Sequence, residues 1–226
     1  FERIYGESPY KSPTDMGVNM AGFCIMDDEA CRRASEQEII RRYYQSLCSL
    51  RQGLSEQEEV FKLELLMNQI GLKPESRAVV PAALARAEET GAPAVAMELP
   101  NGKLVTGKTS PLLGASSACL LNALKCLGGI PEDVLLISPN IIEPIQHLKV
   151  EHMGNHNPRL HTDEVLIALS ICAVTDPNAE RAMEQLAALA GGEVHSTVIL
   201  SRVDENVFQH LRMNLTCEPK YQTCLL

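Results

Sequence analysis

Several features that would define a function class are missing from this sequence of 226 residues. Lysine and arginine total 20 against 29 aspartates and glutamates, which gives a net charge of −9, and no basic block stands out. A groove for nucleic acid or another polyanion is therefore disfavoured. No apolar run approaches the roughly 18 residues of a membrane span, and no secretion signal is visible. We expect a cytoplasmic protein whose partners include neither nucleic acid nor a membrane.

Motifs that bind nucleotides or metals are missing as well. Neither G-x-G-x-x-G nor G-x-x-x-x-G-K-[ST] occurs, so the pairs Gly128-Gly129 and Gly191-Gly192 are interpreted as helix ends. The 8 cysteines are scattered and none forms a C-x-x-C pair. That distribution is typical of reduced thiols rather than of a disulfide framework or a zinc ribbon. The sequence identifies no cofactor.

The first part of the chain predicts a loop followed by helices. Residues 1–33 show no apolar period and are rich in small polar residues and glycine. Capping boxes then occur at Ser35–Glu38 and at Ser55–Glu58, and each precedes apolar residues at helical spacing. A third helical stretch ends at Gly91. We therefore expect residues 1–91 to form a loop and an antiparallel helical subdomain.

From residue 92 the pattern changes to alternating strands and helices. Val95, Met97 and Leu99 alternate with other residues before a turn at Pro100–Lys103, which predicts a β-hairpin. Further helices are expected at 115–127, 141–149, 163–174, 176–191 and 204–212, and further strands at 134–137, 194–200 and 214–217. This order indicates an α/β layered subdomain over residues 92–226. The fold class is therefore α/β, or α+β when the two subdomains are counted separately.

The predicted order of hairpin, helix, strand and helix resembles the cytidine-deaminase-like fold. Zinc deaminases of that fold carry His- or Cys-x-Glu at the start of the helix after the hairpin, and Pro-Cys-x-x-Cys after the next strand. Here the first position reads Ser116–Cys119 and the second reads Pro139–Glu143. Neither the thiolate pair nor the acid–base glutamate is present. We expect the deaminase-like topology without its zinc motif.

A polar loop late in the chain contains three of the 6 histidines, His152, His156 and His161, beside carboxylates. Imidazole and carboxylate groups suit zinc or an ion of the iron group. However, Gly154 and Pro158 interrupt the helix that an H-x-x-x-H metal site needs. Histidines in an exposed loop without a metal are therefore the favoured interpretation.

Arg159 and His161 lie immediately before a helix that is predicted to begin at Thr162. Free N–H groups and the helix dipole favour a phosphate or carboxylate there, so Arg159 is assigned to anion binding. His161 is the candidate acid–base group because its reference pKa lies near neutrality. Asp163 and Glu164 are further catalytic candidates. In the alternative interpretation both carboxylates only complement the dipole, and Arg159 pairs with one of them.

Four stretches are together similar to one known family: Ser8–Gly22, Glu38–Tyr44, Asn157–Leu169 and Leu215–Pro219. The family is bacterial and uncharacterised, and is known as domain-of-unknown-function family 1846 or uncharacterised protein family 0371. The resemblance implies a protein of roughly double length with a Rossmann-like, nucleotide-binding N-terminal half. This chain, which begins at Phe1 rather than Met, would then be the C-terminal half of such a protein.

The resemblance and the two polar segments lead to one leading function. We expect part of a nucleotide-dependent enzyme that acts on a small phosphorylated or nucleoside-like metabolite. Ser12 and Thr14 would supply hydroxyl donors to the substrate and Asn19 an amide. Asp15 or Glu164 would orient His161 or hold a metal. The alternative is a non-catalytic scaffold, oligomerisation or ligand-sensing domain. Expected partners are a small-molecule ligand, the missing N-terminal half and, in the alternative, further copies of the chain.

Overall fold

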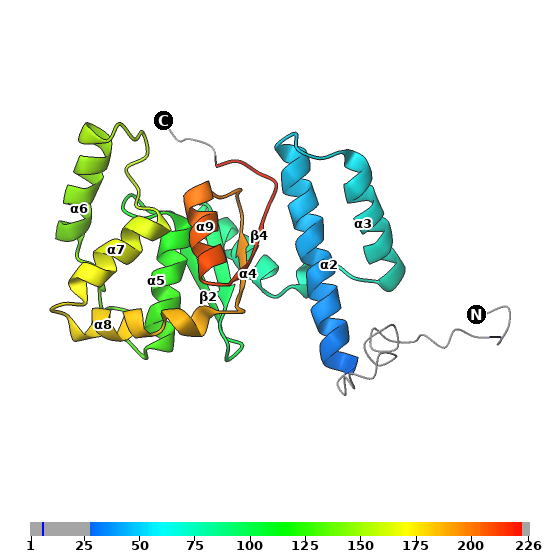
Figure 1. The fold of residues 1–226 in the computed structure, drawn as a ribbon, viewed down its shortest axis with the longest axis horizontal. Helices are drawn as coiled ribbons and strands as arrows, with labels where there is room; N and C mark the ends of the chain where they lie inside the picture. Colours follow the sequence, from blue (N-terminus) through cyan, green and yellow to red (C-terminus); the bar gives the residue numbers. More distant parts are fainter. Residues whose placement is uncertain (1–5, 7–27, 223–226) are drawn as a thin grey trace.

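A computed structural model describes residue 6 and residues 28–222 of the chain. The described residues form a mixed α/β structure in which helices surround one four-stranded sheet (Figure 1). No helix within these residues is long and apolar enough to cross a membrane. Four of the predicted substrate-binding residues lie outside the described part: Ser12, Thr14, Asp15 and Asn19.

Two long helices, α2 (Asp28–Arg51) and α3 (Gln57–Ile70), run side by side in opposite directions at one end of the molecule (Figure 1). The second helix ends as predicted, because Gly71 adopts a left-handed conformation with φ of 68° and its N–H bonds back to the last turn. This pair confirms that the beginning of the described chain is helical.

The capping boxes predicted for these two helices are wrong. α2 begins at Asp28, so Ser35 lies inside the helix and its hydroxyl donates to the carbonyl oxygen of Cys31 (2.9 Å). A serine within a helix commonly bonds the carbonyl four residues earlier in this way. The N-cap of α3 is Glu56, whose side chain makes no capping hydrogen bond.

The sheet has the strand order β2-β1-β3-β4. The strands are β1 (Ala94–Glu98), β2 (Leu104–Lys108), β3 (Glu193–Ser196) and β4 (Asn214–Cys217). β1 is antiparallel to both β2 and β3, whereas β3 and β4 are parallel. The predicted hairpin is confirmed, and its turn is closed by the N–H of Gly102 donating to the carbonyl of Leu99 (2.8 Å).

Helices cover both faces of the sheet (Figure 1). α4 (Val79–Thr90), which the sequence groups with the helical pair, packs on one face against β1 and β2. α5 (Ala115–Leu127), with the predicted bounds, packs on the other face. The remaining helices are α6 (Pro139–His147), α7 (Thr162–Cys172), α8 (Pro177–Glu184) and α9 (Arg202–His210), with a π-helical turn at Leu148–His152 and 3-10 turns at Pro74–Ser76 and Leu186–Leu189.

The strand expected at residues 134–137 is wrong. This segment is an irregular connection between α5 and α6, although Leu136 and Ile137 are buried. Their side chains join the main hydrophobic cluster without a strand partner for their backbone. A short apolar run does not by itself distinguish a strand from another buried segment. The strand beside the hairpin is instead β3, which comes after α5, α6, α7 and α8.

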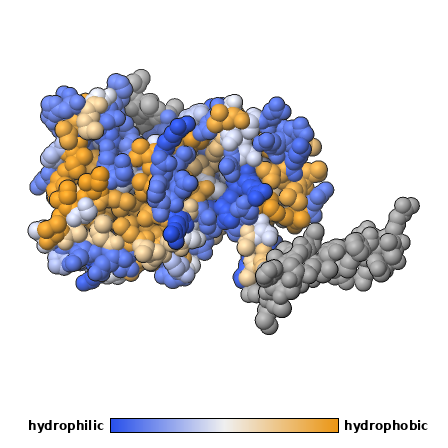
Figure 2. All heavy atoms as spheres, viewed as in Figure 1, coloured by the Kyte–Doolittle hydropathy of each residue, from blue (hydrophilic) through white to orange (hydrophobic). Residues whose placement is uncertain are grey.

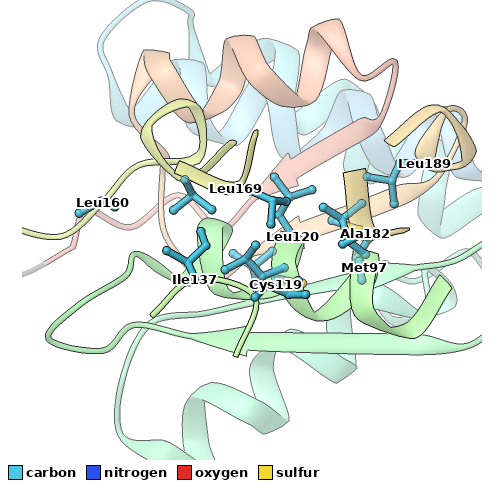
Figure 3. Packing of buried hydrophobic residues seen from close by; sticks show 14 of the residues in the cluster. Met97, Cys119, Leu120, Ile137, Leu160, Leu169, Ala182 and Leu189 are labelled. Atoms are coloured by element: carbon cyan, nitrogen blue, oxygen red, sulfur yellow. The ribbon is translucent and has the colours of Figure 1, made fainter. Parts of the chain in front are cut away.

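The main core lies between the sheet and the helices α5, α7 and α8 (Figure 3). Met97 from β1, Leu120 from α5 and Leu169 from α7 meet there. Alternation along β1 directs Ala96 to the opposite face, where it contacts α4 through Val79. The sheet is therefore buried on both faces along its central strand.

α5 approaches β2 unusually closely, and Gly107 makes that approach possible. A Cβ atom at Gly107 would lie 2.2 Å from the backbone nitrogen of Cys119. The thiol of Cys119 lies 3.5 Å from the carbonyl oxygen of Val105 on the same strand. This close contact fixes the position of the first turn of α5 relative to the sheet.

A buried arginine connects the helical pair to the sheet. Arg77, which is 1% exposed, donates to the carbonyl oxygens of Val194 (3.1 Å) and Asn214 (2.6 Å) and forms an ion pair with Glu193. Glu193 also pairs with Arg41 of α2 (3.0 Å). Because both arginines share one carboxylate, α2 is held beside β3 and β4.

Candidate functional site

Three helices begin at the wall of one small cavity. The N-cap residues of α5, α7 and α9 are Gly114, His161 and Ser201, and all three line a cavity of about 180 Å³. Helix N-termini present free N–H groups and the positive end of the helix dipole. Arg159 lines the same cavity. The structure thus brings two of the predicted site residues, Arg159 and His161, to a place that favours an anion.

The ring of His161 is held by a buried carboxylate that belongs to α9. His161 Nδ1 lies 3.1 Å from Asp204 Oδ2, which also accepts a hydrogen bond from the Ser201 hydroxyl (2.9 Å). Asp204 Oδ1 accepts from the backbone N–H and the hydroxyl of Thr162 (3.0 and 2.9 Å). Nε2 of His161 has no hydrogen-bond partner among the described residues. This nitrogen is therefore free to exchange a proton with a ligand.

The pKa values of His161 and Asp204 shift in opposite directions. The hydrogen bond to Asp204 raises the pKa of His161 above its usual value, although partial burial acts against it. Burial alone would raise the pKa of Asp204, but hydrogen bonds from His161, Thr162 and Ser201 outweigh it and lower that pKa. The arrangement therefore favours an imidazolium beside a carboxylate, the form that attracts an anion and donates a proton.

Glu164 contacts the backbone rather than the ring of His161. Its Oε2 accepts from the His161 N–H (2.8 Å) and from Nζ of Lys149 (2.7 Å). Lys149 is buried and also donates to the carbonyl oxygen of Arg159 (2.8 Å). Asp163 accepts from the N–H of Glu164 (2.7 Å). Asp163 and Glu164 are not among the residues that line the cavity, and Glu164 positions the loop that carries Arg159 and His161.

Arg159 does not pair with either of these carboxylates. Its Nε donates to the carbonyl oxygen of Ser110 (2.9 Å), which fixes the guanidinium beside the cavity. Within residues 28–222 the structure shows no ion pair of Arg159 with Asp163 or Glu164, so that part of the alternative interpretation is wrong. Both carboxylates do lie in the first turn of α7, where they complement the helix dipole. The two terminal nitrogens of the guanidinium have no partner in the part of the chain that the structure describes, so a ligand can bind them.

Asp204 and Ser201 were not predicted as site residues. A local signal exists, because Ser201-Arg202-Val203-Asp204 resembles a capping box, and the Ser201 hydroxyl accepts from the Asp204 N–H (3.2 Å). That pattern indicates where α9 begins. It does not indicate that the carboxylate reaches a histidine 43 positions earlier in the chain.

A metal centre is not evident in the part of the chain that the structure describes. No group of three or more histidine, cysteine, aspartate or glutamate side chains converges there. The ring of His152 packs against His147, with centroids 5.8 Å apart, and neither His152 nor His156 lines the cavity of His161. The three histidines of the polar loop are therefore not brought together.

A larger groove of about 840 Å³ lies between α2 and the strand β4 with α9. Three of its charged groups are paired with one another, since Glu38 binds both Arg41 and Arg42, and no histidine among the described residues lines it. Burial raises the pKa of the Cys48 thiol to about 11, and burial also raises the pKa of the Cys217 thiol. Thiols of this kind are poor nucleophiles. The smaller cavity is thus the better candidate for chemistry.

Two family models match the chain. The model described as Domain of unknown function DUF1846, C-terminal, matches residues 75–226, and the N-terminal model of the same family matches residues 1–71. The match is therefore not confined to the C-terminal model, which corrects the expectation of a C-terminal half alone.

The chain is also similar to bacterial proteins that carry the name UPF0371 protein. Two of them, from Streptococcus thermophilus, are 55% and 56% identical to it, and one from Streptococcus pneumoniae is 54% identical. Each match covers 98% of this chain and 45% of the relative. The chain thus spans about half the length of the curated relatives it matches.

Proposed function

The chain belongs to the family of the domain of unknown function DUF1846, and from the geometry of its cavity we propose that it forms an acid–base site for a small anionic metabolite. The observation that carries the proposal is the way in which the ring of His161 is held. Its Nδ1 is held by buried Asp204, while Nε2 has no partner among the described residues and the residue lines a cavity beside Arg159. A histidine oriented in this way acts as a general acid or base through Nε2.

Each neighbouring group has a role in the proposed site. Arg159 binds the anionic group of the substrate, and Asp204 orients the ring of His161 and stabilises its charged form. Glu164 and Lys149 hold the backbone between Arg159 and His161. The part of the relatives that this chain does not match would supply the nucleotide-binding half that the family resemblance implies.

We also propose that the sheet is a reduced deaminase-like layer. Supporting this are the hairpin β1–β2 beside β3, the parallel pair β3–β4, and the position of α5 directly after the hairpin. Zinc deaminases place a ligand and a glutamate at the start of the corresponding helix. Here Ser116 occupies that turn and lines the cavity. Acid–base chemistry would then come from His161 on a different helix.

The test is a turnover screen of the full-length protein with a panel of phosphorylated metabolites, followed by ³¹P NMR and mass spectrometry. The variant His161→Gln is compared with His156→Gln, because His156 is exposed and does not line the cavity. Loss of general acid–base catalysis lowers a rate by about 10²- to 10⁴-fold. We expect that loss of rate in His161→Gln and an unchanged rate in His156→Gln. An unchanged rate in His161→Gln would contradict the proposal.

A second candidate function is assembly, and exposed apolar helix faces favour it. Figure 2 shows hydrophobic side chains gathered over α3 and at the end of the molecule formed by α6 and α7. Phe61, Leu65 and Ile70 of α3 are 62%, 50% and 51% exposed, and Ile167 and Ile171 of α7 are similarly exposed. Patches of this kind are typical of interfaces. Sedimentation equilibrium decides: an oligomer that Phe61→Ser dissociates supports assembly through α3, and a monomer contradicts it.

A further inference from the structure

The N-terminus of α5 differs from the other two helix ends at the cavity. The first N–H of α7, from Thr162, donates to Asp204 (3.0 Å), and α9 is capped by the hydroxyl of its own N-cap serine. α5 follows Gly114, which has no side chain, and its first turn contains no acidic residue. The N–H groups of Ala115 and Ser116 meet no acceptor among the described residues. The positive end of this 13-residue helix is therefore uncompensated.

Ser116 provides a second, independent sign of a ligand. The residue is 3% exposed and lines the cavity, yet its hydroxyl has no hydrogen-bond partner within residues 28–222. The neighbouring Ser117 is fully buried, and its hydroxyl donates to the carbonyl oxygen of Leu160 (2.9 Å). Ser116 Oγ is not one of the fully enclosed polar atoms that lack a partner, so this oxygen is open to the cavity. A hydroxyl in such a place generally pairs with the molecule that fills the cavity. An unpaired hydroxyl on the wall of a cavity indicates that a ligand completes it.

The donors around this point suit one class of ligand. Backbone N–H groups, a hydroxyl and the free end of the Arg159 guanidinium all border the same cavity. Together they match the peripheral oxygens of a phosphate group. The volume of about 180 Å³ is smaller than the roughly 300–1,000 Å³ of pockets that enclose drug-sized ligands. A phosphate with a short substituent fits this size.

We propose that the first turn of α5, with Ser116 and Arg159, binds the phosphate of a small phosphate monoester. This inference deepens the proposed function by naming the substrate class, and it rests on the same cavity. It does not depend on proton transfer by His161. With the phosphate at α5, the rest of the ligand occupies the space that His161 also lines.

Gly114 allows a test that does not damage the fold. Its φ of −66° is open to any residue, and a Cβ there would lie 3.6 Å from the carbonyl oxygen of Leu160, an ordinary contact. An aspartate at this N-cap would accept hydrogen bonds from the N–H groups of α5 and place a negative charge at the site. We expect Gly114→Asp to keep or raise the melting temperature while phosphate binding is lost.

The experiment is isothermal titration calorimetry with inorganic phosphate, glycerol phosphate and acetate, alongside melting temperatures. Ser170→Ala serves as the matched control, because Ser170 lies on the exposed side of α7. We expect saturable binding of both phosphates by the wild type and the control. Binding should weaken about tenfold in Ser116→Ala, the value of one hydrogen bond to a charged group, and become undetectable in Gly114→Asp.

Three results would contradict a phosphate site at this place: no phosphate binding by the wild type at millimolar concentration, undiminished binding by a folded Gly114→Asp variant, or acetate binding as tight as phosphate binding. A different result would show that only the acid–base function is wrong. In that case His161→Gln keeps the full turnover rate, while Gly114→Asp still loses phosphate binding. Tighter binding of glycerol phosphate than of inorganic phosphate supports the monoester, and the reverse contradicts it.

Discussion

His161 and Asp204 lie 43 residues apart in the sequence, and 3.1 Å separates Nδ1 of the one from Oδ2 of the other. The same carboxylate accepts the first N–H of α7 through Thr162 (3.0 Å). One side chain on α9 therefore caps a neighbouring helix and orients the imidazole at its start. Because Asp204 performs both tasks, the geometry of His161 is coupled to the packing of α7 against α9.

The pKa of His161 should depend on Asp204. The hydrogen bond to Asp204 raises it, so Asp204→Asn should lower the pKa measured by NMR titration of the histidine ring protons. The raised pKa stabilises the folded state below the unfolded value of 6.5, and this stabilisation is lost as pH rises through the folded pKa. Asp163→Asn is the control, because the Asp163 carboxylate accepts from the Glu164 N–H and not from the ring of His161. Equal pKa values of His161 in all three proteins would contradict the pairing.

Removal of the Asp204 carboxylate should destabilise the fold. Asp204→Ala leaves the Thr162 N–H and hydroxyl without their buried acceptor, which costs about 1–3 kcal/mol of unfolding free energy. Since the pKa of Asp204 is lowered, its stabilising effect is present above 3.8 and lost as pH falls through the folded pKa. Urea denaturation at neutral and acidic pH measures both effects. A loss that is identical at both pH values would contradict this explanation.

Gly107 should tolerate no side chain. A Cβ 2.2 Å from the backbone nitrogen of Cys119 would force α5 away from β2. Gly107→Ala is expected to lower the unfolding free energy by about 3 kcal/mol or more. Thr106→Ala, on the same strand, should stay within about 1 kcal/mol of the wild type. If chemical denaturation gave the two variants equal stability, the close approach of α5 would be refuted.

His195 should make the protein less stable in mild acid. It is fully buried between Tyr44 of α2 and Glu218, with ring centroids of Tyr44 and His195 4.8 Å apart. Burial lowers the pKa of His195, although Glu218 acts in the opposite direction. The unfolded chain then binds a proton more readily than the folded one, so stability falls as pH drops below 6.5. When the pH falls from about 7.5 to 5.5, the unfolding free energy of His195→Gln should decrease less than that of the wild type. An equal loss in both proteins argues against this role.

Local signals predicted those elements whose boundaries are set by neighbouring residues. The hairpin follows from the turn at Pro100–Lys103, and the bounds of α5 follow from its apolar period and the glycines after Leu127. The capping box at Ser35 was misleading because the helix had already begun, and a capping pattern does not exclude an earlier start. The segment at 134–137 is buried without being a strand, since a strand also requires a partner.

The candidate site was predicted only in part, for a related reason. Arg159 and His161 precede a helix, so the local pattern was sufficient to select them. Asp204 and Ser116 belong to other helices, and only the tertiary packing brings them to the same cavity. The residue that orients His161 was therefore beyond any argument from spacing.

The most direct measurement is a two-dimensional ¹H–¹⁵N NMR spectrum of the histidine rings during titration with glycerol phosphate. A monoester bound at the N-terminus of α5 lies in the cavity that His161 lines, so the His161 signals should shift and saturate. The signals of buried His195 should not move, and Gly114→Asp should abolish the shift of His161. An unchanged His161 at a saturating concentration of the ligand would contradict the account.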